Sequence, residues 1–194
     1  MEVEMSIDYA ILGLLSRYEL SGYDLKKIFE DSVALYWTGN NNEIYRSLLD
    51  LRERGLVTCQ VQPQEKLPAR KEYTITQLGR EVLSEWSTTA PELPQRRHTL
   101  LIQLAWADAL APDTLDDLLA QYEDEVLTHV LITQAQMQPA APGGRMRFLE
   151  PSSARTPRER LLWQSILQNW FTFYQSELAW VQRLRQQLAD LPPA

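Results

Sequence analysis

The chain has 194 residues, of which 44% are hydrophobic and 23% are charged, and its formal net charge is −7. This composition is that of an ordinary globular protein, and the length suits one medium domain or two small ones. The acidic balance argues against a general binder of polyanions. The longest apolar run near the start, residues 10–15, is too short to span a bilayer, and the acidic first residues do not form a secretory signal.

Residue types that carry enzyme or metal chemistry are sparse. The single cysteine, Cys59, excludes an internal disulfide framework and is typical of a reducing cytoplasm. His98 and His129 lie 31 positions apart, so they form no metal-binding pattern. The sequence has no glycine-rich phosphate loop, nucleophile elbow or catalytic triad. We therefore expect no metal, no cofactor, no enzymatic activity and no membrane association, and we expect a cytoplasmic location.

Two short helices are predicted first. Residues 6–17 have the apolar periodicity of a mostly buried helix. Ser21 and Asp24 then have the spacing of a capping box, with the acid near the positive end of a helix dipole. A second helix should therefore run from about residue 22 to 31.

A third helix is predicted from about residue 41 to 54. Ile44, Leu48 and Leu51 repeat at helical spacing and should face the core. Gly55 is a favourable residue just beyond a helix end.

After Gly55 the apolar period becomes that of strands. Residues 56–62 and 70–76 alternate, and the polar, proline-containing segment between them predicts a β-hairpin. Thr76 should cap a fourth helix that begins at residue 77. Three helices, a hairpin and a further helix are the order of a winged helix-turn-helix domain.

Residues 87–95 contain two prolines and no periodicity, so we place a boundary between domains of residues 1–90 and 91–194. The second domain is predicted to be helical over about 97–109, 112–138 and 158–190. The last helix is longer than a local neighbour is expected to cover, and its apolar residues recur at three- and four-residue steps, a seam suited to a partner helix. The seam consists of Trp163, Leu167, Trp170, Tyr174, Leu178, Val181, Leu184 and Leu188. We therefore expect a mainly α protein with an N-terminal winged helix-turn-helix domain and an α-helical C-terminal dimerisation domain.

The first domain contains the segments AILGLLSRYELSGYDLKKIFED, NEIYRSLLDLRERGLV and RKEYTITQLGREVL, which begin at residues 10, 42 and 70. Together these three segments resemble the PadR family of transcriptional regulators. Trp37 and the helical tail WQSILQNWFTFYQSELAWVQRL resemble the subgroup typified by the virulence activator AphA. The resemblance implies a homodimer that places one winged helix on each half of an inverted-repeat operator, with the C-terminal helices forming the dimer. Asn40, Asn41 and Asn42 depart from that subgroup, so its operator sequence does not carry over.

The asparagines stand where a helix-turn-helix protein contacts DNA. In that motif the first residues of the second helix reach base edges in the major groove. Asparagine can pair with adenine through two hydrogen bonds, and arginine with guanine. We expect Asn41, Asn42, Tyr45 and Arg46 to point away from the core and to contact double-stranded DNA.

A structural explanation of the same residues is also open. Asn40 would cap the helix, Asn41 and Asn42 would be solvated, and Arg46 would pair with Asp50 four residues later.

The hairpin is expected to contribute cations to the same surface. Residues 46–80 carry a net charge of +3 in an otherwise acidic chain. Lys66 at the tip, with Arg70 and Lys71 at the start of the second strand, would neutralise phosphates. Tyr73 is expected to pack beneath the wing, and a simply solvated hairpin is the alternative.

The tryptophans of the tail raise the question of a ligand. Aromatic residues at helical spacing usually fill a core or an interface, so binding of a small aromatic effector is the less favoured interpretation. The leading hypothesis is a dimeric, sequence-specific DNA-binding regulator. The alternative is a winged-helix protein-interaction module that does not bind DNA directly.

Overall fold

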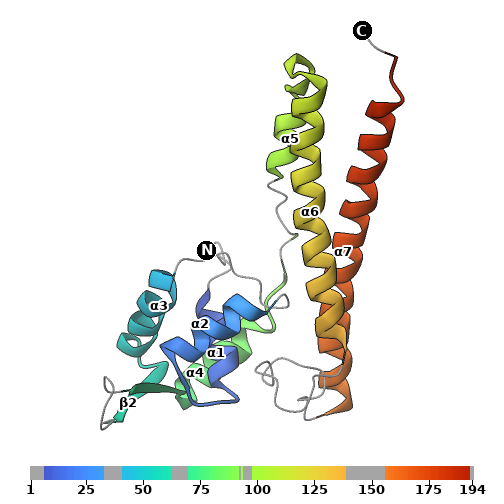
Figure 1. Ribbon diagram of the computed structural model, residues 1–194. Coiled ribbons are helices and arrows are strands. Elements are labelled where there is room, and N and C mark those ends of the chain that lie inside the picture. Colours follow the sequence, from blue (N-terminus) through green and yellow to red (C-terminus); the bar gives the residue numbers. More distant parts are fainter. Residues whose placement is uncertain are drawn as a thin grey trace. The chain divides into compact units, whose positions relative to one another are not determined.

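The computed structural model describes residues 7–32, 41–62, 70–91, 93, 98–138 and 156–192. The chain divides into two compact units, residues 1–92 and 93–194, which we call unit 1 and unit 2 (Figure 1). None of the helices in the described residues is long and apolar enough to cross a membrane.

The described residues of unit 1 form four helices and a small sheet. The helices are α1 (Ile7–Leu15), α2 (Gly22–Asp31), α3 (Asn41–Glu53) and α4 (Gln77–Trp86). Each confirms a predicted helix, and their ends differ from the prediction by two residues at most. Their apolar faces form one core, whose fully buried members include Ile11, Leu12, Leu15, Leu25, Leu48 and Leu51.

The predicted caps are also confirmed. The backbone N–H and the hydroxyl of Ser21 donate to Asp24 Oδ2 at 2.8 and 2.6 Å, and the Asp24 N–H donates to Ser21 Oγ at 3.2 Å. Thr76 Oγ accepts from the Gly79 N–H at 3.0 Å and begins α4. Gly55 has a φ of 70°, the left-handed conformation that ends α3 at low steric cost.

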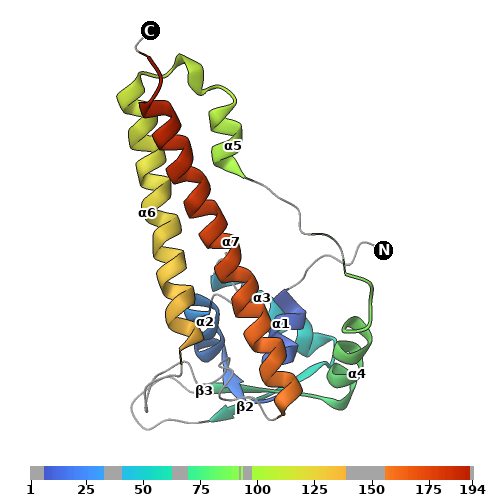
Figure 2. The ribbon, with the colours of Figure 1, turned by 90° about the vertical axis from the view of Figure 1, so that its right-hand side faces the viewer.

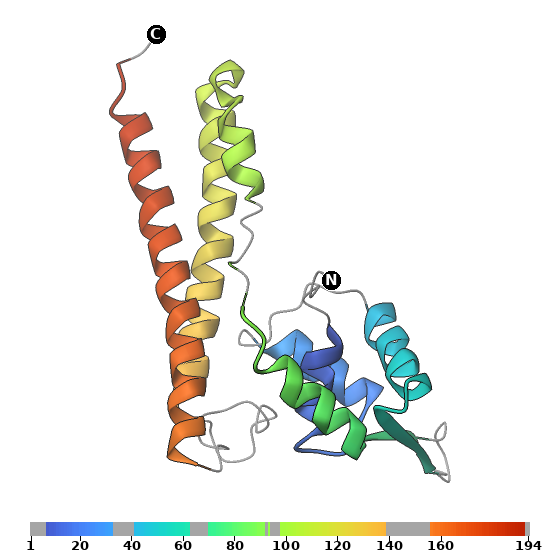
Figure 3. The ribbon, with the colours of Figure 1, turned by 180° about the vertical axis from the view of Figure 1, so that it is seen from behind.

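The sheet is antiparallel and has three strands. Strands β2 (Val57–Gln62) and β3 (Arg70–Ile75) form the predicted hairpin, and Figure 3 shows α3 leading directly into β2. A two-residue strand, β1 (Leu20–Ser21), pairs with the other edge of β3, so that the order is β1-β3-β2. Strand β1 is too short for any periodicity, which is why the sequence did not predict it.

Two helical glycines of unit 1 should respond oppositely to the same substitution. A Cβ atom on Gly79 would lie 2.2 Å from the backbone oxygen of Leu56, whereas one on Gly13 would meet nothing within 4 Å. Because a backbone oxygen cannot swing aside, Gly79→Ala should lower the free energy of unfolding by about 2 kcal/mol. Gly13→Ala should raise it by about 0.5–1 kcal/mol, since alanine favours a helix. Urea unfolding followed by circular dichroism measures both; equal effects would contradict the packing around Gly79.

Unit 2 is built on two long antiparallel helices. They are α6 (Pro112–Met137) and α7 (Pro157–Ala189), which lie side by side in Figure 2, and α5 (Thr99–Leu104) packs at the start of α6. A short 3-10 turn, η1 (Ala107–Ala109), follows α5. Leu100, Leu119 and Val181 are buried together and so join α5, α6 and α7.

The antiparallel packing alters the interpretation of the α7 seam. We expected α7 to be too long for a local neighbour, but α6 runs along it. Leu167, Tyr174 and Val181 are consequently buried within the chain's own unit 2. The other five seam residues are partly buried, and Leu184 and Leu188 pack on the Val181 cluster. Three of the eight seam residues therefore belong to the core of unit 2, and the five partly buried ones still leave surface for a partner helix.

Polar contacts reinforce this packing. The Arg185 guanidinium contacts Asp116 at 2.9 Å and Glu123 at 2.6 Å, tying α7 to α6. It lowers the pKa of the Asp116 carboxyl, and hydrogen bonds from Gln182 and Arg185 lower the pKa of Glu123. At pH values above the usual pKa range of carboxyl groups, these lowered pKa values stabilise unit 2. The contribution is lost as the pH falls through that range.

A second polar cluster links α5, α6 and α7. The Tyr122 hydroxyl donates to Glu177 Oε2 at 3.0 Å, and His98 Nε2 lies 3.0 Å from the same oxygen. The other imidazole nitrogen, Nδ1, accepts from the Leu101 N–H at the start of α5. Burial, followed by the bond to Glu177, raises the pKa of Tyr122. His98 thus has a structural role.

Tyr122 should make unit 2 sensitive to alkali. A folded-state pKa above the unfolded value of about 10 means that stability is retained below pH 10 and is lost as the pH rises further. The free energy of unfolding should therefore fall as the pH rises above about 10, and less steeply in Tyr122→Phe. Tyr23 is exposed, so the variant Tyr23→Phe serves as the control and should keep the wild-type slope of unfolding free energy against pH. Equal slopes in the two variants would contradict the role of Tyr122.

Candidate nucleic-acid interface

Helix α3 presents two distinct faces. Ile44, Leu48 and Leu51 are buried and fix the rotation of the helix about its axis. Tyr45 and Arg46 are therefore turned outward: Tyr45 is 46% exposed, and Arg46 is also exposed. A tyrosine and a guanidinium can donate hydrogen bonds to phosphates or base edges.

The asparagines stand at the beginning of this helix. Asn41 is its first residue, Asn42 is exposed, and the predicted cap Asn40 lies outside the described residues. Asn42 also makes an interaction within the protein. The first N–H groups of any α-helix lack partners within the helix, so this end favours an anion.

The alternative interpretation of Arg46 is wrong in one respect. Asp50 does not pair with Arg46, because Asp50 Oδ2 lies 3.0 Å from Arg54 Nη1. No hydrogen bond or ion pair joins Arg46 to another described residue. Arg54 also reaches Asp8 of α1 at 3.3 Å, and the Ser47 hydroxyl donates to Asp8. Arg54 therefore has a structural role, and it anchors α3 on α1.

The base of the hairpin places its two cations differently. Arg70 Nη2 lies 2.8 Å from Asp24 Oδ2, and Arg70 Nε lies 3.0 Å from Glu72 Oε1. Lys71 is exposed, and no described residue pairs with it. Lys66, predicted at the hairpin tip, lies outside the described residues. Of the wing cations that can be placed, Lys71 alone is unneutralised.

Tyr73 lies beneath the hairpin, as expected. It is 5% exposed and stands opposite half-buried Cys59 across β2 and β3. Burial raises the pKa of its hydroxyl, and Cys59 adds to that effect, so Tyr73 stays neutral. Its role is to pack the sheet.

The sequence did not reveal the surroundings of Tyr45. Gly22, the first residue of α2, comes so close to the Tyr45 ring that a Cβ atom there would lie 2.4 Å from Cε1. The only signal in the sequence was a glycine at a helix start, where other residues are equally common.

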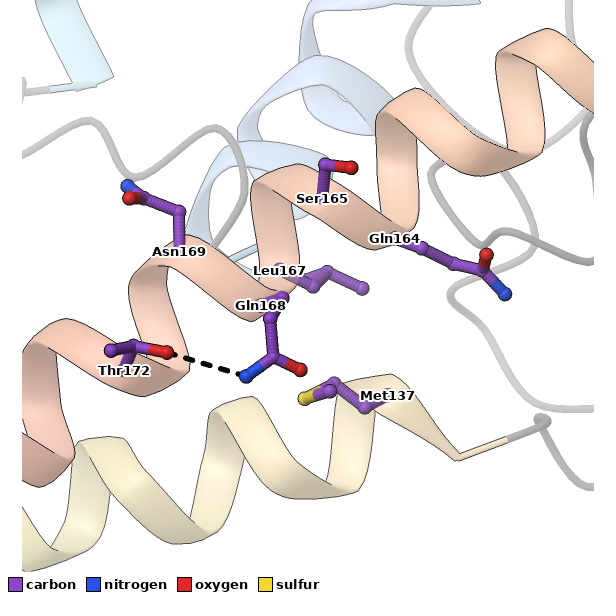
Figure 4. A pocket seen from close by; sticks show the side chains of 7 residues that line it. All are labelled: Met137, Gln164, Ser165, Leu167, Gln168, Asn169 and Thr172. Atoms are coloured by element: carbon purple, nitrogen blue, oxygen red, sulfur yellow. Dashed lines mark hydrogen bonds between the residues drawn. The ribbon is translucent and has the colours of Figure 1, made fainter.

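A cavity in unit 2 is the main candidate for a small ligand. It has a volume of about 610 Å³ and lies between the end of α6 and the first half of α7 (Figure 4). Its walls combine neutral amides and hydroxyls with two apolar side chains. The described lining residues are Met137, Gln164, Ser165, Leu167, Gln168, Asn169 and Thr172. This set can hydrogen-bond an uncharged molecule but offers no cation to a carboxylate. Within the described parts of the chain, no group of residues could hold a metal ion.

Comparison with protein families gives two matches that together cover most of the chain. Residues 11–85 match the transcriptional regulator PadR-like family. Residues 96–189 match the family described as virulence activator alpha C-term. The two matches fall in unit 1 and unit 2 respectively.

Characterised relatives are similar over part of their length. The negative transcriptional regulator PadR of Bacillus subtilis is 34% identical over 89 residues, which are 46% of this chain and 49% of that protein. A probable transcriptional regulator of Mycobacterium tuberculosis is 32% identical over 98 residues, 50% of this chain and 52% of the other. The chain thus spans about half the length of the curated relatives it matches.

Solved structures share the fold over nearly the whole chain. Bacillus subtilis PadR in complex with operator DNA superposes with a TM-score of 0.72 at 20% identity, covering 94% of this chain and 98% of that one. The Vibrio cholerae virulence activator AphA gives 0.68 at 24% identity, covering 95% and 98%. Bacillus subtilis PadR in complex with p-coumaric acid gives 0.68 at 21% identity, covering 95% and 99%. These likenesses establish a winged-helix fold with a helical C-terminal region.

Proposed function

Because this chain belongs to the PadR-like family of transcriptional regulators, we propose that it binds DNA sequence-specifically, as a homodimer on an inverted-repeat operator. One observation carries the proposal. The buried stripe of α3 turns Tyr45 and Arg46 outward at the helix start, where helix-turn-helix proteins contact bases.

The proposed contacts divide into two kinds. Arg46 and the asparagines at positions 41 and 42 would read base edges, and Tyr45 would contact a phosphate or a base edge. Lys66 and Lys71 would neutralise phosphates beside the hairpin. Arg70, included in this group from the sequence, is engaged with two carboxylates and is better explained by another role.

Lys71 provides a test of the phosphate contact. Lys71→Gln should weaken binding to every duplex by a similar factor and should reduce the slope of log affinity against log salt by about 0.9 for each protomer, or about 1.8 for the dimer. Lys71→Arg keeps the charge and should preserve the slope. Fluorescence anisotropy between 50 and about 200 mM salt makes the measurement. An unchanged slope in Lys71→Gln would exclude the contact.

We place the dimer contact in unit 2, on apolar side chains that the chain itself leaves exposed. Trp106 is 79% exposed and Ile102 is 66% exposed, and Leu131, Leu161 and Leu162 are more than half exposed. Large exposed apolar surface marks protein–protein contacts when it is contiguous, and a dimer would cover these side chains. Analytical ultracentrifugation should give twice the chain mass of 22.5 kDa. A monomer at concentrations that bind DNA would argue against this part of the proposal.

Selection of bound fragments from the source genome tests the proposal as a whole. Enriched fragments should share an inverted repeat whose half-sites lie about one helical turn, 10–10.5 base pairs, or a multiple of it apart. No enriched sequence, or an enriched sequence without two-fold symmetry, would contradict sequence-specific binding by a dimer.

The second candidate is a winged-helix module that docks a protein partner. The net charge of −7 favours it, because electrostatic attraction supplies most non-specific affinity for DNA. Salt separates the two candidates, since a DNA-binding protein loses affinity steeply as salt rises and a protein-docking module has no DNA affinity to lose.

An aromatic effector remains a secondary proposal. The complex of Bacillus subtilis PadR with p-coumaric acid supports the idea for the fold, although the described residues that line the cavity of Figure 4 are all uncharged. A regulator must share a compartment with its promoters, and the proposal therefore includes a cytoplasmic location.

A further inference from the structure

Two contacts in unit 1 converge on the first turn of α2. Gly22 begins the helix, and the Asp24 carboxylate closes its capping box. Through Gly22 the turn touches α3, and through Asp24 it touches β3. These are the two elements that, under the proposed function, contact DNA.

Gly22 provides room for the Tyr45 ring. A Cβ atom at position 22 would lie 2.4 Å from Cε1, 3.1 Å from Cδ1 and 3.2 Å from Cζ of Tyr45. Carbon atoms in contact stay about 3.5–4 Å apart, so any side chain at position 22 must displace the ring. The backbone itself does not require glycine here, because Gly55 is the residue with positive φ in the described chain. The missing side chain serves the close approach of Tyr45.

Asp24 connects the same turn to the hairpin. Its Oδ2 accepts from the Ser21 N–H and hydroxyl and from Arg70 Nη2 at 2.8 Å. Arg70 Nε also contacts Glu72 at 3.0 Å. Because Arg70 is half-exposed, the ion pair contributes little to stability. Two carboxylates nevertheless fix the direction of the guanidinium, which is turned to the protein.

We propose that the first turn of α2 positions both DNA-contacting elements: Gly22 seats Tyr45 of α3, and Asp24 holds Arg70 and with it the base of the wing. This inference rests on the proposed function. Gly22, Asp24 and Arg70 are positioning residues, which act on DNA affinity through the groups they hold.

A double-mutant cycle tests whether the absence of a side chain at Gly22 positions the Tyr45 ring. The obstructing atoms belong to a side chain that can swing, so Gly22→Ala should fold with a nearly unchanged unfolding midpoint. Its affinity for the selected duplex should fall about tenfold because the ring is misplaced. Tyr45→Ala should also weaken binding, and Gly22→Ala should cause no further loss in that background. Wild-type affinity in Gly22→Ala, or losses that add, would overturn the inference.

The role of Arg70 is tested by substitutions that remove or keep its charge and by the salt dependence of DNA binding. If Arg70 holds the wing, Arg70→Gln should weaken binding and leave the salt slope unchanged, whereas Lys71→Gln reduces the slope. Arg70→Lys should fail to restore affinity, because an ammonium group lacks the planar fork that spans two carboxylates. Restored affinity in Arg70→Lys, or a reduced slope in Arg70→Gln, would assign Arg70 to a phosphate and overturn its positioning role.

A measurement without DNA separates this inference from the proposed function. Hydroxyl-radical oxidation of Tyr45, read by mass spectrometry, should be faster in Gly22→Ala than in the wild type because the displaced ring is more exposed. Equal rates of Tyr45 oxidation in the two proteins would show that Gly22 does not position the ring, whether or not the protein binds DNA. Failure of the wild type to bind any selected duplex would instead overturn the proposed function.

Discussion

Replacing Leu119 with alanine should lower the free energy of unfolding of unit 2 by about 2–5 kcal/mol. Leu119 is 0% exposed and contacts the cluster in which Leu100 of α5 and Val181 of α7 are also buried. Alanine would leave a cavity where three helices meet, and close-packed neighbours relax only partly into such a space. The loss should therefore lie among the larger values for a single substitution.

The control lies on the same helix. Leu127 is 41% exposed, so Leu127→Ala should change the free energy of unfolding by about 0.5 kcal/mol or less. Urea unfolding of both variants, followed by circular dichroism, makes the comparison. A similar loss for the two leucines would mean that the antiparallel pair of α6 and α7 does not bury Leu119 as described.

Arg46→Ala should weaken binding to the selected operator by about 1–3 kcal/mol for each half-site, roughly 5- to 150-fold per half-site, and should relax the preference at one base position of each half-site. Arg46 is exposed at the start of α3, and no described residue pairs with it. A guanidinium in that position can make two hydrogen bonds to guanine that the wrong base does not accept. Binding to a scrambled duplex should fall much less, because phosphate attraction remains.

Arg52 provides the matched control. It is exposed on the same helix, near the opposite end. Arg52→Ala removes the same charge but should leave the base preference intact. Anisotropy titrations on operator and scrambled duplexes distinguish the two arginines. Equal losses on both duplexes for Arg46→Ala would remove its base-reading role.

Local chemistry explains why so much of unit 1 could be predicted. Ser21, Gly55 and Thr76 mark helix ends through hydrogen bonds or dihedral angles that involve neighbouring residues, so a short stretch of sequence reveals them. The stripe of Ile44, Leu48 and Leu51 similarly determined which face of α3 is outward.

The missed features depend on residues distant in the chain. Arg70 appeared to be a wing cation until Asp24, 46 positions earlier, was found beside it. The α7 stripe appeared suited to a partner because periodicity shows that a face is apolar without showing what covers it. The structure supplies α6 as that cover, which buries Leu167 and Val181. Pairing between distant elements was the information that periodicity lacked.

Hydroxyl-radical footprinting tests the central claim most directly, because it asks whether the outward face of α3 meets DNA. Oxidation of Tyr45 would be compared in the free protein and in its complex with the selected duplex. Leu191, which is 63% exposed beyond the end of α7 and lies in no proposed contact, serves as the internal control. Strong protection of Tyr45 with unchanged oxidation of Leu191 is the predicted result. Undiminished oxidation of Tyr45 in a saturated complex would show that DNA binds elsewhere and would contradict the account.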